Sequence, residues 1–227
     1  MIKKNKHSKL SYIFNWISGD VLSSDTAKII NSFTETENLY MSAIREISTK
    51  LEILNDEFKY SKDRNPIHEI KSRIKTPVSI YQKLVERGND LSVESARKNL
   101  TDIAGIRVIC PYINDIYLIA DLLTSQADVG VIRRTDYIKD PKPNGYRSLH
   151  LIVTIPVFLS DRTEVVNVEV QIRTIAMDFW ASLEHELTYK LASRKTEDVL
   201  KELRECADII SSTDNRMQNL YNNIVNL

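Results

Sequence analysis

The 227-residue sequence contains only two cysteines, five glycines and six prolines. Cys110 and Cys206 lie far apart, so neither a disulfide framework nor a zinc site is expected. No apolar run approaches the roughly 20 residues that span a bilayer. Lys and Arg total 31, as do Asp and Glu, so net charge gives no sign of a membrane or nucleic-acid partner. We therefore expect a cytoplasmic protein without membrane segments.

The composition, 42% hydrophobic and 27% charged, is typical of a globular chain long enough for one large domain. Apolar residues recur at helical spacing across residues 26–60, and a more charged helix is predicted across 196–225. We predict one domain over residues 1–227. Within it, a helical extension at 1–60 precedes a core at 61–193 and a C-terminal helix at 194–227.

The core alternates between strand and helix patterns. Strands are predicted at 103–110, 129–138, 148–158 and 163–173. Helices are predicted at 91–100, 113–126 and 174–193, and residues 67–88 are interpreted as helical, at least from Val78, with an end at Gly88. The short connection at 159–162 predicts an antiparallel hairpin. The pattern indicates an α+β fold with a central mixed β-sheet of about five strands flanked by helices.

The predicted strand at 163–173 alternates strictly between apolar and polar side chains. One face carries Val166, Val168, Val170 and Ile172. The other face carries Asn167, Glu169, Gln171 and Arg173. This polar row could hold a metal and a polyanion, although a plain solvated face would give the same pattern.

Basic residues gather in two segments. The first group is Lys71, Arg73, Lys75, Lys83 and Arg87, and the second is Arg133, Arg134, Lys139, Lys142 and Arg147. Such clusters beside restricted turns suggest phosphate binding, although charged helix faces are also common. Neither a Gly-x-Gly-x-x-Gly motif nor a Walker-type phosphate loop accompanies them.

Two acids and one loop complete the candidate site. Asp102 begins a predicted strand and Glu169 lies on another, so the pair could chelate Mg²⁺, or one acid could act as a general base toward a hydroxyl. Asp102 could equally cap a turn. In the loop that leads to the strand at 148–158, Tyr146 could stack on a purine and Arg147 could pair with a phosphate, whereas His150 could be purely structural.

Together these segments resemble the synthetase domain of the RelA/SpoT-homologue family, most closely its stand-alone small alarmone synthetases. The matching segments are residues 73–80 with Lys83, 102–108, 136–138, 144–150, 169–174, and 179–185 with Tyr189 and Lys190. The resemblance implies a nucleotidyltransferase-like synthetase domain whose catalytic core is residues 61–193. It also implies a GTP/GDP pyrophosphokinase of the stringent response. Such an enzyme transfers pyrophosphate from ATP to the 3′-hydroxyl of GDP or GTP, giving (p)ppGpp and AMP.

The resemblance also implies roles for individual residues. Arg73, Lys75, Ser79 and Lys83 would bind the ATP phosphates, and Arg73 with Arg107 would flank the adenine. Asp102 and Glu169 would bind Mg²⁺, or Glu169 would act as base on the 3′-hydroxyl. Tyr146 would stack on the guanine. The other residues expected around the acceptor nucleotide are Lys142, Arg147, His150 and Gln171.

Other functions stay open. A toxic relative on this fold could use an adenosine nucleotide or the 3′ end of tRNA as acceptor, and the chain could also be a catalytically silent nucleotide-binding module. The even net charge and the acid-rich residues 196–214 count against tRNA. Asp178 stands where some relatives carry Asn, which could alter base recognition or merely mark a different subgroup. Apolar stripes along the predicted helices at 26–60 and 196–225 predict a homo-oligomer. Analogy with the family makes a tetramer the expected form.

Overall fold

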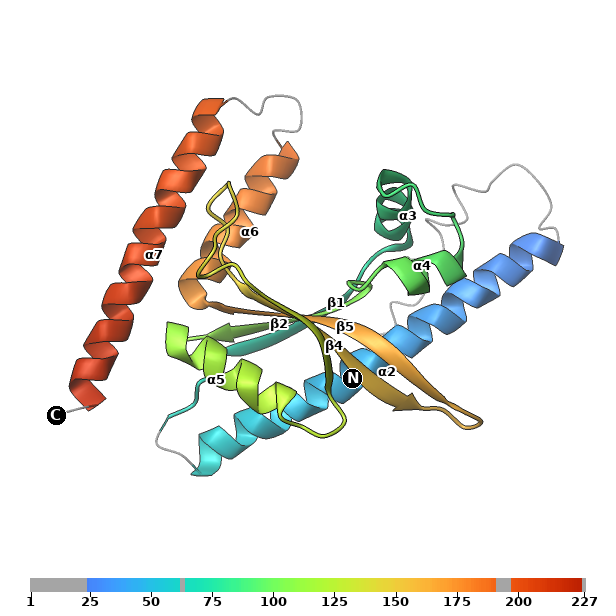
Figure 1. Ribbon diagram of the computed structural model, residues 1–227, viewed down its shortest axis with the longest axis horizontal. Coiled ribbons are helices and arrows are strands. Elements are labelled where there is room, and N and C mark those ends of the chain that lie inside the picture. The colour runs from blue at the N-terminus through green and yellow to red at the C-terminus, as the bar shows by residue number, and fades with distance from the viewer. Residues whose placement is uncertain (1–23, 62–63, 191–196, 226–227) are drawn as a thin grey trace, which may run out of the picture. The chain divides into compact units, whose positions relative to one another are not determined.

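The computed structural model describes residues 24–61, 64–190 and 197–225 (Figure 1). The chain forms two compact units, Met1–Glu37 and Asn38–Leu227. The part of the predicted N-terminal extension before Ser24 lies outside the described residues. None of the described helices is long and apolar enough to cross a membrane.

Five strands form one mixed sheet in the order β1-β2-β5-β4-β3. They are β1 (Glu69–Ile74), β2 (Ala104–Cys110), β3 (Gly130–Asp136), β4 (Leu149–Phe158) and β5 (Thr163–Thr174). Strands β2 and β5 pair in parallel, and the other neighbours pair antiparallel. The predicted hairpin is confirmed, because β4 and β5 pair from Leu149 with Ile172 to Phe158 with Thr163. The predicted α+β fold with a five-stranded mixed sheet is therefore confirmed.

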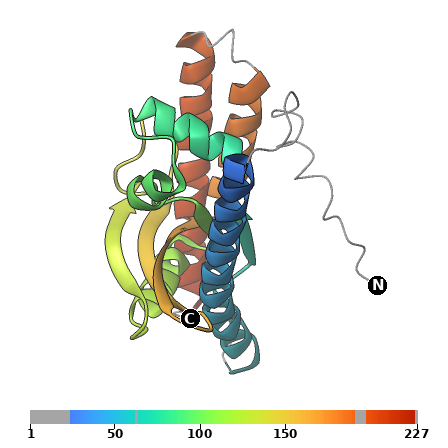
Figure 2. The same cartoon turned by 90° about the vertical axis from the view of Figure 1, so that its right-hand side faces the viewer.

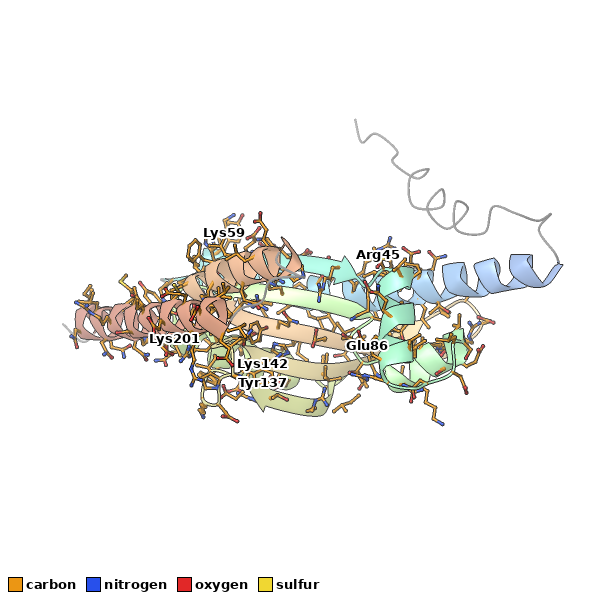
Figure 3. The ribbon with its side chains drawn as sticks, turned by 90° about the horizontal axis from the view of Figure 1, so that it is seen from above. Arg45, Lys59, Glu86, Tyr137, Lys142 and Lys201 are labelled. Atoms are coloured by element: carbon orange, nitrogen blue, oxygen red, sulfur yellow. The ribbon has the colours of Figure 1, made fainter. Side chains whose placement is uncertain are left out.

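Six helices accompany the sheet in the described part of the chain. They are α2 (Ser24–Ser61), α3 (Pro77–Glu86), α4 (Val93–Asn99), α5 (Ile113–Thr124), α6 (Ile175–Lys190) and α7 (Glu197–Val225). Helices α6 and α7 lie side by side (Figures 1 and 2). Seen from above, the sheet lies between this pair at one end and α3 with α4 at the other (Figure 3).

The two faces of β5 have different environments. Val168, Val170 and Ile172 are fully buried, and they share one core with Ile47 of α2 and Ile119 of α5. Burying one such aliphatic side chain stabilises the fold by about 1.5–3 kcal/mol. This burial fixes the register of β5, because a one-residue slip would place its polar side chains in the core. The polar side chains of β5 therefore lie on the opposite face of the sheet.

The helix interpretation of residues 67–88 is wrong before Pro77, because Glu69–Ile74 is strand β1 at the edge of the sheet. Pro77 opens α3, and its ring disfavours helical backbone at the preceding residue. Thr76 caps the helix by accepting a hydrogen bond from the Ser79 backbone N–H at 3.2 Å. As an edge strand, β1 exposes Lys71 and Arg73, so it lacks the apolar run by which the inner strands are recognised.

Helix α7 presents one buried carboxyl group to the end of β5. Asp214 is 8% exposed and accepts a hydrogen bond from the Thr174 hydroxyl at 2.5 Å. Burial raises the pKa of Asp214, and the hydrogen bond from Thr174 offsets only part of that effect. The folded protein therefore holds this proton more tightly than the unfolded chain does.

We expect Asp214→Asn to stabilise the protein near neutral pH but not in acid. As pH rises above the ordinary pKa of 3.8, Asp214 loses its proton in the unfolded chain before it does so in the folded protein. The folded state is therefore destabilised relative to the unfolded state, whereas Asn at this position has no proton to lose and causes no such change. The Tm difference between variant and wild type should therefore grow from about pH 4 to about pH 7. Glu202→Gln, at an exposed position of the same helix, should show no such growth. A constant difference would contradict the assignment.

Candidate active site

One face of the sheet collects predicted site residues from four strands. The register pairs Arg73 with Gly105, Gly105 with Glu169, and Gln171 with both Arg107 and His150. Paired residues of neighbouring strands project to the same side of a sheet. Arg73, Arg107, Glu169, Gln171 and His150 therefore share the face opposite the aliphatic core, as the alternation of β5 predicts.

Asp102 lies just before β2 and is held by two lysines. Its Oδ2 accepts hydrogen bonds from Lys75 Nζ at 2.7 Å and from Lys83 Nζ at 2.5 Å. Burial would raise the pKa of Asp102, but the hydrogen bonds and charges of the lysines outweigh it and lower the pKa. Oδ1 is buried without a hydrogen-bond partner. An ionised carboxylate therefore keeps one oxygen available beside two ammonium groups.

The N-terminus of α3 adds hydrogen-bond donors beside these lysines. The Thr76 and Ser79 hydroxyl oxygens lie 2.9 Å apart in its first turn. Arg73, on β1, pairs with Gly105 of β2, and its side chain packs over this glycine. A helix N-terminus with neighbouring cations favours a polyanion. Arg73, Lys75, Ser79 and Lys83 thus lie at one end of the site.

Glu169 occupies the middle of the polar face. Its Oε2 accepts a hydrogen bond from Gln171 Nε2 at 2.9 Å, and its Oε1 lies 3.4 Å from His150 Nδ1. Burial would raise the pKa of Glu169, but its contacts with His150 and Gln171 prevail and lower it. Asp102 is near enough for its charge to raise the pKa of Glu169 slightly against that trend. The two predicted acids therefore lie within electrostatic reach of each other.

An aromatic cluster borders Glu169. The Tyr146 hydroxyl lies 2.8 Å from His150 Nε2, and the ring centroids of Tyr137 and His150 are 5.1 Å apart. Lys142 and Tyr137 lie next to each other (Figure 3), and Lys142 Nζ is 4.8 Å from the ring centroid of Tyr137. The same Nζ is 4.8 Å from the ring centroid of Tyr146. Burial raises the pKa of Tyr146, so its hydroxyl stays neutral. The cluster combines aromatic rings with hydrogen-bonding groups, and the cations of Lys142 and Arg173 lie over the Tyr146 ring.

Asp178 and Arg173 link the two ends of the site. Asp178 Oδ1 lies 3.1 Å from Arg107 Nη1 and 3.2 Å from Arg173 Nη1. Arg173 Nη2 donates to Tyr146 Oη at 2.7 Å and to Gln171 Oε1 at 2.6 Å. The sequence places Arg173 in the polar row of β5 but assigns it no role in the site. The alternation of β5, which puts it on the same face as Glu169, was the available signal.

Arg147 does not join this group. Its guanidinium donates to the Ala207 carbonyl at 3.2 Å and to Asp208 Oδ1 at 2.9 Å, both on α7. The second basic cluster is also divided, because Arg134 of β3 pairs with Asp121 of α5 at 2.6 Å, and both side chains are exposed. Fewer basic side chains therefore reach the site than their clustering in the sequence suggests.

Comparison with known proteins places the chain in a family. Residues 72–194 match the region found in RelA/SpoT proteins. The chain is 44% identical to the GTP pyrophosphokinase YwaC of Bacillus subtilis, over 79% of this chain and 85% of that protein. It belongs to the RelA/SpoT family. A second family member from Bacillus subtilis, the GTP pyrophosphokinase YjbM, is 34% identical over 80% of this chain and 84% of its own length.

Solved structures of RelA/SpoT family members have the same fold. Small alarmone synthetase 2 from Bacillus subtilis superposes with a TM-score of 0.77 and 41% identity, over 84% of this chain and 98% of that one. Small alarmone synthetase 1 from the same organism, bound to its product pppGpp, gives a TM-score of 0.76 and 32% identity, over 82% and 94%. The same protein bound to AMPCPP gives a TM-score of 0.74 and 28% identity, over 87% of this chain and 100% of that one.

We expect Asp178→Ala to destabilise this RelA/SpoT family member by about 3 kcal/mol, because it leaves two guanidinium groups without their counter-ion in a buried network. Chemical denaturation measures the loss. Asp178→Asn, which keeps an acceptor oxygen, should lose less. Asp161→Asn serves as control, because Asp161 is 67% exposed in its pair with Arg162 and should leave the unfolding free energy unchanged. Equal stability of Asp178→Ala and wild type would refute the role of this acid.

Proposed function

We propose that the chain is a GTP pyrophosphokinase, a small alarmone synthetase that transfers the β,γ-pyrophosphate of ATP to the 3′-hydroxyl of GDP or GTP. The observation that carries the proposal is a pair of acids within electrostatic reach of each other, Asp102 held by two lysines and Glu169 beside His150 on the polar face of the sheet. The names of the two curated Bacillus subtilis relatives describe the same activity. We also propose a cytoplasmic location, because ATP and GTP are intracellular nucleotides.

The lysine end of the site suits the ATP phosphates. Pyrophosphate transfer places negative charge on several phosphate oxygens at once, and cations held in position before the reaction stabilise that charge. Lys75 and Lys83 approach Asp102 beside the N-terminus of α3 and are the proposed phosphate ligands, together with Ser79 and Arg73. Arg107, on the neighbouring strand, is proposed to flank the adenine with Arg73.

Mg²⁺ fits the proposed acid pair. Buried Asp102 Oδ1 has no hydrogen-bond partner and is a candidate ligand, as is Glu169. Across the described ranges, no group of three or more His, Cys, Asp or Glu side chains could hold a metal ion. This suits Mg²⁺, which commonly binds one or two carboxylates and takes its remaining oxygens from water and substrate phosphates. Bound there, the ion would supply positive charge to the phosphates.

The aromatic end of the site suits the acceptor nucleotide. The lowered pKa of Glu169 keeps it ionised at neutral pH, so it can accept the proton of the 3′-hydroxyl. The hydroxyl oxygen attacks the β-phosphorus, the bond from that phosphorus to the α,β-bridging oxygen breaks, and AMP leaves. Tyr146 is proposed to stack on the guanine, beside Lys142 and His150. Gln171 orients Glu169 through their 2.9 Å hydrogen bond.

Incubation of the protein with Mg²⁺, γ-labelled ATP and GDP or GTP should give labelled ppGpp or pppGpp with an equal amount of AMP. Glu169→Gln removes the base and should lower kcat by about 10²–10⁴-fold with the fold intact. Glu164→Gln, on the same strand but paired with Arg97 and Arg162 outside the site, should retain activity. A fully active Glu169→Gln would refute the assigned base.

The same assay separates the alternatives when adenosine nucleotides and tRNA are also offered as acceptors. Label on an adenosine nucleotide or on the tRNA 3′ end, without guanosine product, would identify a relative with another acceptor. Nucleotide binding without AMP release would identify a silent binding module. Either result would overturn the proposed activity.

We further propose that the protein is a homo-oligomer, specifically a tetramer. Large apolar side chains stand exposed on α7, with Ile209 at 66%, Leu220 at 54% and Ile224 at 68%. Exposed apolar patches on a helix commonly mark protein contacts. Light scattering should give four times the 26.2 kDa chain mass, and Ile224→Asp should lower the assembled fraction. A mass of one chain for the wild type would contradict the proposal.

A further inference from the structure

The loop between β3 and β4, residues 137–148, carries Lys142 and Tyr146 and rests directly on helix α7. At Gly145 the backbone has φ +89°, and a Cβ there would lie 2.6 Å from the Cβ of Ala207. Ala207 is 3% exposed. The loop backbone and the helix are therefore in contact with no room for a side chain between them, and only glycine adopts this φ without strain.

Arg147 joins the loop to the helix with one guanidinium group. Its Nη1 donates to the Gly145 carbonyl at 3.1 Å and to the Ala207 carbonyl at 3.2 Å, and its Nη2 donates to Asp208 Oδ1 at 2.9 Å. Arg204 on α7 reaches the opposite way, to the Pro143 carbonyl at 3.5 Å. Two arginines thus connect the loop and α7 from both sides.

Tyr146 lies between these attachment points and packs on the same helices. Its ring contacts the small apolar cluster of Trp180, Ala181 and Ala207 formed by α6 and α7. Its hydroxyl faces the sheet, where it meets His150 and Arg173. The position of this ring therefore depends on α7 as well as on the sheet.

Helix α7 is itself fixed at its other end. Asp214 accepts from Thr174 at the end of β5, and Gln218 Oε1 accepts from the Asn114 backbone N–H at 2.9 Å. Tyr221 accepts from Arg64 Nε at 2.9 Å. These bonds tie α7 to the sheet and to α5. The helix is thus a fixed support for the loop.

We propose that α7 positions the acceptor nucleotide, with the Arg147–Asp208 pair and the Gly145–Ala207 contact holding Tyr146 and Lys142 in place. The inference rests on the proposed function and deepens it. Arg147 acts through the loop and is a positioning residue. The ATP end of the site is built on β1, β2 and α3, which do not include the loop or α7. Weakening the attachment should therefore affect the acceptor and spare ATP.

The test compares KM values for the two substrates in variants of α7. Loss of a partly exposed ion pair corresponds to about a fivefold change in binding. Asp208→Ala should therefore raise KM for GDP and GTP about fivefold, while KM for ATP and kcat at saturating acceptor stay within about twofold. Asp208→Glu should restore KM. Glu205→Gln, at an exposed position of the same helix, is the matched control and should behave as wild type.

A second variant covers the apolar contact. Ala207→Leu pushes a larger side chain against Gly145 and should raise KM for GDP and GTP more than tenfold, provided that circular dichroism shows the native helix content. Unchanged acceptor KM in both Asp208→Ala and Ala207→Leu would overturn the proposal. An equal rise in the KM for ATP would also overturn it, because that pattern indicates general destabilisation.

Binding separates this inference from the proposed function. A fluorescent GDP analogue titrated in the absence of ATP should show about fivefold weaker Kd for Asp208→Ala than for wild type. That titration reports on the loop even if the wild-type protein forms no alarmone. The absence of alarmone would refute the proposed activity but not the positioning role of α7. Equal Kd values would overturn the positioning role whatever the activity.

Discussion

The guanidinium of Arg173 is the interaction on which the polar face of the sheet depends. It is 2% exposed, and a buried charge is tolerated only where partners replace the lost water. Asp178 supplies the opposite charge, while Tyr146 and Gln171 accept hydrogen bonds from it. Burial lowers the pKa of Arg173, and the acid offsets part of this effect. One buried cation thereby sets the orientation of the side chains on either side of Glu169.

Charged side chains are paired differently at the two ends of the site. At the lysine end, both ammonium groups share one oxygen of Asp102, so an arriving polyanion competes with this carboxylate for them. At the aromatic end, Arg173 is paired with Asp178, and Glu169 lies beside the ring of His150. The first arrangement suits a highly charged donor phosphate. The second suits recognition of a neutral base by stacking and by directed hydrogen bonds.

The sequence predicts the inner strands of the sheet, but it does not predict the edge strand β1 or the pairing of Arg147, which depend on tertiary contacts. The alternation of β5 is visible because each apolar residue meets a continuous core, and this placed Glu169 and Gln171 on one face. Strand β1 carries no such signal, because an edge strand with exposed Lys71 and Arg73 resembles a charged helix face. Arg147 follows Tyr146 directly, yet it faces a helix some 60 residues later in the chain. No local pattern encodes that pairing.

Helix α7 connects the loop at residues 137–148 with the proposed assembly surface. Ala207, Asp214, Gln218 and Tyr221 recur at spacings of seven, four and three residues, so they lie along one helical stripe, which faces the loop, the end of β5 and α5. Ile209, Leu220 and Ile224 lie along another stripe and are exposed. One stripe of α7 therefore supports the loop, and the other is exposed for the proposed contact with a second chain. The proposed ATP end is built on β1, β2 and α3, and Asp178 connects it to the aromatic end through Arg107 and Arg173.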